Sequence, residues 1–195
     1  RQDKPKSFDR NRIKFIGNKM FEFGEPDEFY LNDGDGRFTL LEWVGGRFTT
    51  HAGKPLAEPY RDQGLSAIFR DMNGDHAPDL FIANDGFTED RCWINDGSGR
   101  FREISPLAIR QLSYSAMGVD FADINRDGHD DFFVVEMLSR NHARRLTQQG
   151  TIPGAKVGPG NFTHRPQSRR NCLYVARGDG TFAEKITVPA SCAVP

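Results

Sequence analysis

Short runs of apolar residues, separated by polar turns rich in glycine, aspartate and asparagine, recur along most of the chain. Two clear examples are residues 80–83 (LFIA) and 132–136 (FFVVE), which are rich in aromatic and β-branched side chains. Runs of this length are typical of buried β-strands, because a surface helix needs a longer pattern with a period of 3.6 residues. The pattern therefore predicts an all-β protein.

Three hairpins share a second pattern, in which an apolar run leads into a glycine-rich turn and then into a phenylalanine. They span residues 29–38, 92–101 and 173–182. Turns of the type Asn-Asp-Gly and Gly-Asp-Gly supply the positive φ angles of tight hairpins, so their acidic side chains are expected to shape the turn rather than bind a metal. One strand position in each hairpin is aromatic and is predicted to pack between repeat units: Tyr30, Trp93 and Tyr174.

Each of the last two hairpins follows a pair of further strands, which gives a unit of four. The predicted strands are residues 65–70, 80–83, 91–94 and 100–104, and then 117–122, 132–136, 172–175 and 181–186. Four antiparallel strands at this period are typical of one blade of a β-propeller. The sequence thus predicts a single domain over residues 1–195, which forms a partial propeller of about two and a half to three blades.

The predicted blade units are about residues 1–44, 64–106 and 116–188, and the first lacks a complete set of strands. The spacing of the repeats differs between units because of two insertions. One lies near residues 45–62 and the other spans residues 138–171. Both are expected to form surface loops, since connections between strands usually run over the protein surface.

An acidic loop joins the first two strands of each complete unit, at residues 71–79 and 123–131. Oxygen-bearing side chains stand at positions one, three, five and nine, and a backbone carbonyl is available at position seven. This set suits calcium, which takes six to eight oxygen ligands. The alternative is a solvated turn rich in Asp and Asn. The predicted ligands of two Ca²⁺ ions are Asp71, Asn73, Asp75, Ala77 through its carbonyl and Asp79, and then Asp123, Asn125, Asp127, His129 through its carbonyl and Asp131.

An EF-hand is excluded, because its twelfth position carries a bidentate glutamate whereas Ile82 and Val134 stand there in this chain and strands follow both loops. The two loops differ at position six, where the second has Gly128 and the first has His76. If that position requires a positive φ, histidine adopts it at a cost of about 1 kcal/mol relative to glycine. The first loop is therefore expected to be the weaker calcium site.

The chain has 195 residues, of which 37% are hydrophobic, 26 are basic and 27 are acidic. This balance gives no overall field that favours nucleic acid, and no apolar stretch approaches the roughly 20 residues of a membrane span. The odd number of cysteines, Cys92, Cys172 and Cys192, allows at most one disulfide and signals no zinc site. The chain starts at Arg1 without an apolar leader, which is consistent with a processed or partial sequence.

The insertion at residues 138–171 has a formal charge of +7 and contains no aspartate or glutamate. Such segregation of charge favours contact with an anionic ligand, such as an acidic polysaccharide or an acidic protein surface. Two alternatives are packing against the acidic remainder of the same chain and a mobile basic loop. The residues expected to contact a partner are Arg140, Arg144, Arg145, Arg165, Arg169 and Arg170.

The loop at residues 123–131, its Phe-Ala-Asp lead-in and the Gly-Asp-Gly-Thr-Phe hairpin at residues 178–182 resemble the FG-GAP or VCBS repeat family. Integrin α-subunit propellers belong to that wider group. More narrowly, residues 118–138 and the basic insertion that follows them resemble large secreted bacterial proteins with these repeats. The resemblance covers about residues 20–186. It implies calcium within the blades and an extracellular, cell-surface or periplasmic location. It also implies more blades than this chain holds, so remaining blades of a parent chain or self-association are expected partners.

No signature of a hydrolase elbow, a Walker loop, a zinc protease or a dinucleotide site is present, which favours a protein that is not an enzyme. The resemblance implies a calcium-stabilised module for recognition of a protein or a glycan, as in adhesion. One alternative is a non-catalytic or substrate-binding part of a larger secreted hydrolase or lyase. Another is a purely structural scaffold.

Overall fold

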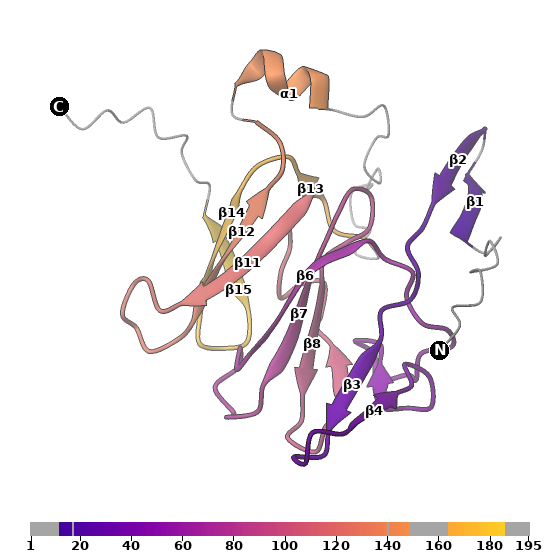
Figure 1. Ribbon diagram of the computed structural model, residues 1–195. Coiled ribbons are helices and arrows are strands. Elements are labelled where there is room, and N and C mark those ends of the chain that lie inside the picture. The colour runs from indigo at the N-terminus through magenta and orange to yellow at the C-terminus, as the bar shows by residue number, and fades with distance from the viewer. Residues whose placement is uncertain (1–11, 17, 140, 149–163, 186–195) are drawn as a thin grey trace.

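The computed structural model of the protein describes residues 12–16, 18–139, 141–148 and 164–185 (Figure 1). Within these residues one short helix accompanies fifteen strands, so the all-β prediction is confirmed. Cys92 and Cys172 are free thiols, and Cys192 lies outside the described residues. The elements are β1 (Ile13–Ile16), β2 (Lys19–Glu22), β3 (Phe29–Asn32), β4 (Phe38–Leu41), β5 (Phe48–Thr49), β6 (Gly64–Arg70), β7 (Asp79–Asn84), β8 (Arg91–Asn95), β9 (Phe101–Glu103), β10 (Leu112–Ser113), β11 (Ala116–Ala122), β12 (Asp131–Glu136), α1 (His142–Gln148), β13 (Gln167–Ser168), β14 (Cys172–Ala176) and β15 (Phe182–Lys185).

The two complete units fold into two sheets that each contain four antiparallel strands, as the sequence predicts. One sheet places β6, β7, β8 and β9 side by side, and the other places β11, β12, β14 and β15 in the same way. The predicted strands lie close to the observed bounds, because turns mark both ends of each apolar run. Each unit is thus a meander in which every strand pairs with the next.

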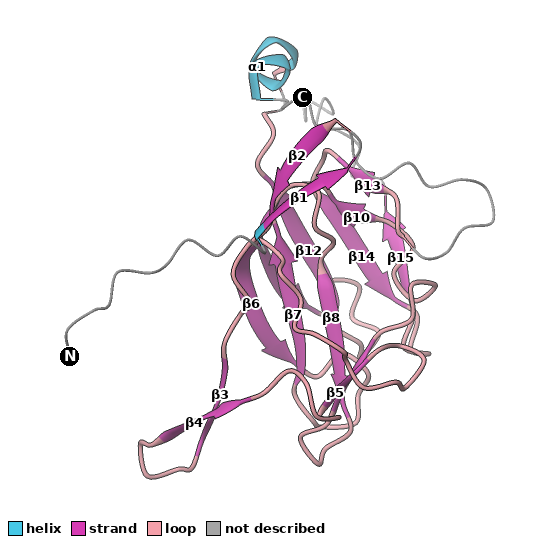
Figure 2. Cartoon of the chain, turned by 90° about the vertical axis from the view of Figure 1, so that its right-hand side faces the viewer, coloured by secondary structure: helices cyan, strands magenta, loops and turns pink. Residues whose placement is uncertain are grey.

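The two sheets lie beside each other (Figure 2). Aromatic side chains hold them together, since the ring of Phe81 in β7 lies 6.3 Å from that of Phe121 in β11 and 5.3 Å from that of Phe132 in β12. The rings belong to a buried cluster that extends through both sheets. The first strands of the two sheets, β6 and β11, also lie next to each other, and Arg70 forms an ion pair with Asp130. The main core therefore lies between the two units.

The insertion near residues 45–62 is not the simple surface loop that was expected. It contributes β5, which pairs parallel with β9, and Phe48 of this strand is fully buried. The ring of Phe48 stacks on Phe101 at 5.2 Å and meets Trp93 edge-on at 5.4 Å. A strand of two residues has no detectable periodicity, so this segment packs on the first sheet without a pattern that predicts it.

The insertion at residues 138–171 also does more than form a loop in its described parts. It contains α1, and β13 near its end pairs parallel with β10. The backbone N–H of Leu112 donates to the carbonyl of Pro166 at 3.0 Å, which extends this pairing. The end of the insertion is therefore fastened to the connection between the two units.

The first unit consists of two separate hairpins in its described residues, β1 with β2 and β3 with β4. Because the first unit lacks a full sheet, the aromatic position that the three predicted hairpins share is buried in the two complete units but not in the first. Trp93 is 0% exposed and Tyr174 is 1% exposed, as predicted, whereas Tyr30 is 48% exposed. The prediction for Tyr30 was wrong, because in the described part of the chain no complete neighbouring sheet covers it. The described sheets do not close into a ring, and the propeller stays a prediction.

Candidate metal loops and a pocket at the opposite end

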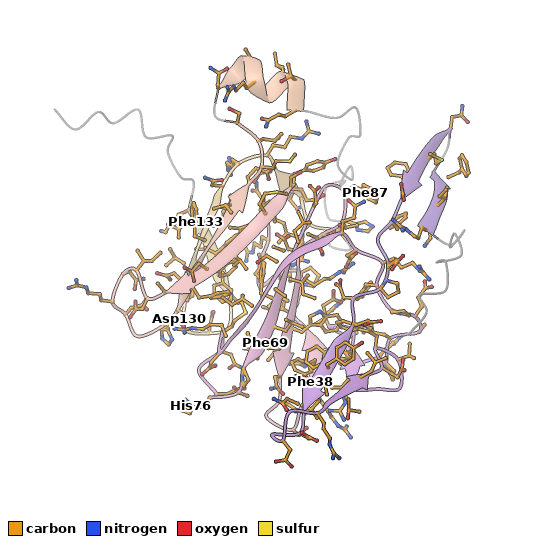
Figure 3. The ribbon with its side chains drawn as sticks, viewed as in Figure 1. Phe38, Phe69, His76, Phe87, Asp130 and Phe133 are labelled. Atoms are coloured by element: carbon orange, nitrogen blue, oxygen red, sulfur yellow. The ribbon has the colours of Figure 1, made fainter. Side chains whose placement is uncertain are left out.

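The first acidic loop (residues 71–79) is organised by the carboxylate of Asp71. Its Oδ1 accepts the N–H groups of Gly74 and Asp75 at 2.8 and 3.2 Å, and its Oδ2 accepts that of His76 at 2.9 Å. The side-chain amide of Asn73 donates to Asp75 at 2.8 Å. These bonds hold together the side chains at positions one, three and five. In Figure 3 the label of His76 marks this loop at the lower end of the first sheet.

The second acidic loop (residues 123–131) repeats the same arrangement. Asp123 accepts the N–H groups of Asp127 at 3.1 Å and Gly128 at 2.9 Å, and the amide of Asn125 donates to Asp127 at 2.8 Å. The N–H of His129 at position seven donates to the carboxylate at position five at 2.9 Å, as does that of its counterpart Ala77 at 2.8 Å. The two predicted loops therefore share one local fold.

The aspartates at position nine have a role that their spacing alone did not reveal. Asp79 and Asp131 are fully buried. Asp79 accepts the N–H groups of Met72 and Asn95, both at 2.8 Å, so it fastens the loop to the end of the third strand. Asp131 likewise accepts the N–H of Ala176 at 2.9 Å. A carboxylate has more acceptor positions than these bonds use, and the assignment of both residues as calcium ligands stays a prediction.

The electrostatics of the first acidic loop suit a cation. Burial raises the pKa of Asp79 to about 6, against hydrogen bonds that lower it, and the charges of Asp75 and Asp71 raise it further. A bound cation would relieve this accumulation of negative charge. The donors are carboxylates, amide oxygens and carbonyls, which calcium prefers. Within the described part of the chain, no three His, Cys, Asp or Glu side chains form a ready metal-binding group, so calcium stays a prediction.

The expected ranking of the two loops is not supported by their backbone. His76 at position six does adopt a positive φ, of 67°, while Gly128 has 86° in the second loop. At position four, however, the first loop has Gly74 with a φ of 80° and the second has Arg126 with 64°. Each loop therefore places one glycine and one larger residue in the left-handed region. The backbone cost assigned to His76 is matched by that of Arg126, and strain gives no reason for a weaker first site.

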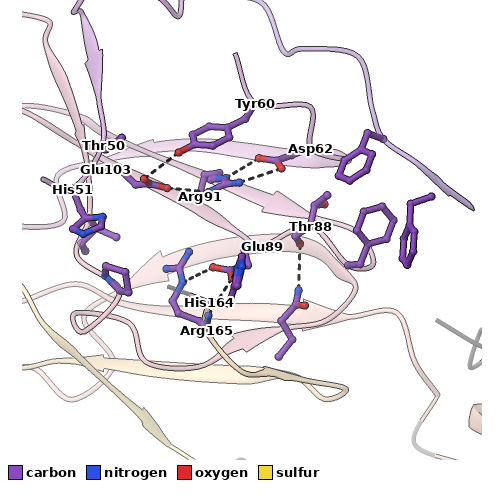
Figure 4. Close-up of a pocket in the computed structure, with 16 residues that line it drawn as sticks. Thr50, His51, Tyr60, Asp62, Thr88, Glu89, Arg91, Glu103, His164 and Arg165 are labelled. Atoms are coloured by element: carbon purple, nitrogen blue, oxygen red, sulfur yellow. Dashed lines mark hydrogen bonds and ion pairs between the residues drawn. The ribbon is translucent and has the colours of Figure 1, made fainter. Parts of the chain in front are cut away.

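A pocket of about 1010 Å³ lies at the end of the first sheet opposite the acidic loops (Figure 4). Its position follows from the strand order, because the first acidic loop precedes β7 and the pocket is lined by the connection that follows β7. One wall is aromatic: the ring of Phe87 meets those of Phe21 and Phe23 edge-on at 5.2 and 5.0 Å. The volume is in the range of small-molecule sites.

Charged side chains of the pocket are already paired with one another. Arg91 donates to Asp62 at 2.7 Å and to Glu103 at 3.0 Å, and its guanidinium lies 3.7 Å from the ring centre of Tyr60. Burial alone would lower the pKa of Arg91, but the two carboxylates outweigh it and raise that pKa. Burial and the charge of Glu103 likewise raise the pKa of Tyr60. The guanidinium of Arg91 is therefore held in place and its charge is balanced by the carboxylates of Asp62 and Glu103.

The end of the second insertion supplies the opposite wall of the pocket. Several arginines that were predicted to bind a partner instead contact residues of the same chain. Arg165 is buried, donates to Glu89 at 2.9 Å and donates to the carbonyl of Asp90 at 2.8 Å. Arg170 pairs with Glu184 at 2.9 Å, and Arg169 lies over the ring of Tyr114. These contacts support the alternative in which the insertion packs against its own chain. Arg144 is exposed, Arg145 lies in α1 and Arg140 lies outside the described residues.

The sequence did not predict this pocket. Its lining comes from β2 and the residue after it, the first insertion, the β7–β8 connection with the start of β8, the end of β9 and the end of the second insertion. Side chains that are this far apart in the chain have no common spacing. The only local signal was the presence of two insertions, which often carry function.

Comparison with known families gives a match in the region of both loops. Residues 71–134 match the model of the FG-GAP-like repeat. The chain carries an FG-GAP-like repeat. The match begins at the first residue of the first acidic loop, includes the β8–β9 hairpin and the second acidic loop, and ends in β12. No curated protein matches the chain. In the described part of the chain, no helix is long and apolar enough to cross a membrane.

Proposed function

We propose that this FG-GAP-like repeat chain is a calcium-stabilised recognition module of an extracellular protein, with blade units at about residues 1–44, 64–106 and 116–188 of a β-propeller. The repeat itself supports an extracellular role, and the two sheets pack through their faces as neighbouring blades do. The observation that carries the recognition role is the pocket. It lies at the end opposite the acidic loops. In this proposal the loops bind calcium and stabilise the sheets, and the pocket binds the ligand.

The acidic loops serve the structural task. Asp71, Asn73, Asp75 and the carbonyl of Ala77 would hold one ion, together with Asp79, and the corresponding residues of the second loop would hold the other. A bound ion supplies a compact positive charge that balances the clustered carboxylates. Because Asp79 and Asp131 also accept backbone N–H groups from the third strands, the loop fold and the sheet register depend on the same side chains.

Removal of calcium is expected to lower the melting temperature by about 5 to 10 °C per site, since a ligand at 100 times its Kd stabilises by about 2.7 kcal/mol. Calorimetry with saturating calcium and with EGTA would measure this shift. Asp75→Ala and Asp127→Ala should each remove a similar part of it, because the two loops carry matched backbone strain. The matched control is Asp179→Ala in an exposed hairpin turn. An EGTA melt equal to the calcium melt would eliminate the metal assignment.

The pocket is best suited to an uncharged saccharide. Its aromatic wall of Phe21, Phe23 and Phe87 offers apolar surface to the C–H face of a sugar ring. Its charged groups form internal pairs, so an ionic ligand would have to compete with the Arg91 and Arg165 pairs, at the cost of desolvated charges. Hydroxyl groups can instead add hydrogen bonds to paired carboxylates, which retain acceptor positions.

Phe87→Ala is expected to weaken binding of a neutral oligosaccharide about tenfold, because a buried aromatic anchor carries much of the binding energy at such sites. An array of neutral and acidic glycans would find the ligand, and calorimetry would give its Kd. Phe38→Ala, an exposed residue of β4, is the matched control.

Binding of neutral sugars should change little with ionic strength. Selective, salt-sensitive binding of acidic glycans would overturn the neutral-sugar assignment in favour of the exposed arginines. Cleavage of the bound sugar would favour the hydrolase or lyase alternative. No binding of any glycan, with the calcium effect intact, would favour a scaffold.

A further inference from the structure

The β3–β4 hairpin holds the same place in its unit as β8–β9 and β14–β15 hold in theirs. The hairpins align residue by residue, so that Phe29 corresponds to Cys92 and Phe38 to Phe101. In the complete units the third strand pairs with its hairpin partner on one side and with the second strand, β7 or β12, on the other. In the described structure β3 pairs with β4 alone. Among the residues that the structure describes, no strand lies beside its other edge, which therefore presents unpaired backbone groups.

The backbone alternation of the aligned strand β8 identifies these groups. The N–H of Asn95 points to Asp79 in β7, whereas the carbonyl of Cys92 points the other way and accepts from Ile104. Backbone groups alternate between the two edges with a period of two residues. The residues of the first hairpin whose N–H groups point to the free edge are therefore Glu28, Tyr30 and Asn32.

An exposed aromatic side chain lies beside this edge (Figure 3). A groove of about 370 Å³ runs between β3 and β6, and Phe69 of β6 borders it. Phe69 is 51% exposed, whereas Phe121, its counterpart in β11, is 7% exposed. The ring of Phe121 meets Phe132 of its own sheet at 5.1 Å and Phe81, the middle residue of the apolar run in β7, at 6.3 Å. Where the preceding unit is complete, its second strand thus adds a ring to this position.

The two second strands that are present share one chemical pattern. In β7, Asp79 precedes Leu-Phe-Ile, and in β12, Asp131 precedes Phe-Phe-Val. The three apolar residues face the third strand in antiparallel register. The aspartate accepts the N–H of the residue that ends the third strand, Asn95 or Ala176. Asn32 holds that place in β3, and in the described residues no second strand stands opposite it.

We propose that the free edge of β3 binds an antiparallel β-strand of a partner polypeptide, in which an aspartate precedes three apolar residues. The proposal rests on the proposed function only in treating the units as equivalent blades. The apolar residues pair opposite Tyr30, Phe29 and Glu28, and the aspartate accepts the N–H of Asn32. The middle apolar side chain meets Phe69 as Phe81 meets Phe121.

A peptide with the sequence of residues 78–85, Pro-Asp-Leu-Phe-Ile-Ala-Asn-Asp, is the probe. Added to the whole chain, it is expected to bind one to one and to slow amide hydrogen exchange at Glu28, Tyr30 and Asn32. The amides of Phe29 and Leu31 already point to β4 and serve as internal controls. NMR-detected exchange resolves the two sets. Equal protection of both sets, or of neither, would overturn the proposed register.

Substitutions test the same contact by affinity, measured as the anisotropy of the labelled peptide. A peptide with proline at its phenylalanine should bind at least about tenfold more weakly, because proline removes an N–H and disfavours central strands. Phe69→Glu in the protein should do the same, whereas Leu146→Glu on the exposed face of α1 should not. Circular dichroism checks that both variants fold.

The outcomes separate this proposal from the proposed function. No saturable binding of the peptide, with the calcium and glycan results intact, overturns the strand proposal alone. Self-association of the chain through β3 that the peptide does not compete with would also overturn it, in favour of a second copy. Peptide binding with the predicted exchange pattern supports it even if EGTA leaves the melt unchanged, a result that would sink only the calcium assignment.

Discussion

Asp131→Ala is expected to lower the free energy of unfolding by about 3 kcal/mol or more, since each buried donor left without an acceptor costs about 1–3 kcal/mol. The carboxylate is fully buried and accepts the N–H groups of Ile124 at 3.2 Å and Ala176 at 2.9 Å. Alanine leaves both donors unpaired at the junction of the second acidic loop and β14. Urea unfolding followed by circular dichroism would give the change.

Two controls decide whether the buried hydrogen bonds explain this loss. Asp131→Asn keeps one acceptor and should have an intermediate effect, whereas Asp179→Ala, in the exposed turn before β15, should have a much smaller one. The ranking should persist in EGTA, because the backbone bonds need no metal. If the loss at Asp131 disappears in EGTA, the residue acts through calcium and the hydrogen-bond account is wrong.

The strand pattern was predictable because its determinants are local. In both complete units an apolar run between two turns gives a strand, and the repeat of the pattern gives the order of pairing. The acidic loops were predictable for the same reason, since all their oxygen donors lie within nine consecutive residues. β5 was not predictable, because the burial of Phe48 depends on Trp93 and Phe101, which are distant in sequence.

For the arginines that were predicted to bind a partner, the charge of the segment did not indicate which residues they contact. The sequence gives the positive charge of the second insertion but not which carboxylates face it. Arg165 forms an ion pair with Glu89, which lies 76 residues away in the sequence, and Arg170 forms one with Glu184 across the β14–β15 hairpin. The sequence positions of Arg165 and Glu89 therefore do not predict that these two residues pair. The interpretation as self-packing, which was one of the alternatives, therefore gains support from the fold alone.

The buried carboxylate of Asp90 presents a contrast within the repeat. Its Oδ1 accepts the N–H of Asn84 at 2.9 Å, and its Oδ2 has no hydrogen-bond partner among the described residues. Burial raises its pKa to about 7, against the opposing effects of that hydrogen bond and of Arg165, while Glu136 and Glu89 raise it further. In the second unit the corresponding residue is Asn171, which accepts the N–H of Glu136 at 2.8 Å. An uncharged amide thus performs the same capping task.

Asp90→Asn is expected to make the protein more stable at pH 8 by up to about 4 kcal/mol and to change little at pH 4. In the unfolded chain the pKa of the carboxyl is near 3.8, and in the folded protein it is about 7. Folding therefore takes up a proton between these values, so stability falls as pH rises through this window and levels off above pH 7. An asparagine has no charge to bury, and its amide replaces the unpartnered oxygen.

Urea midpoints across pH 4 to 8 would show this as a flatter profile for Asp90→Asn. A smaller slope should remain, because the raised pKa of Asp79, about 6, has the same sign. The reciprocal variant, Asn171→Asp, should add a slope of its own, since it places a second carboxyl beside buried Glu136. If Asp90→Asn and the native chain lose stability in parallel as pH rises, Asp90 is ionised throughout and its charge is balanced by Arg165. In that case Asn171 of the second unit replaces an ion pair that is already balanced. It does not remove the cost of a buried charge.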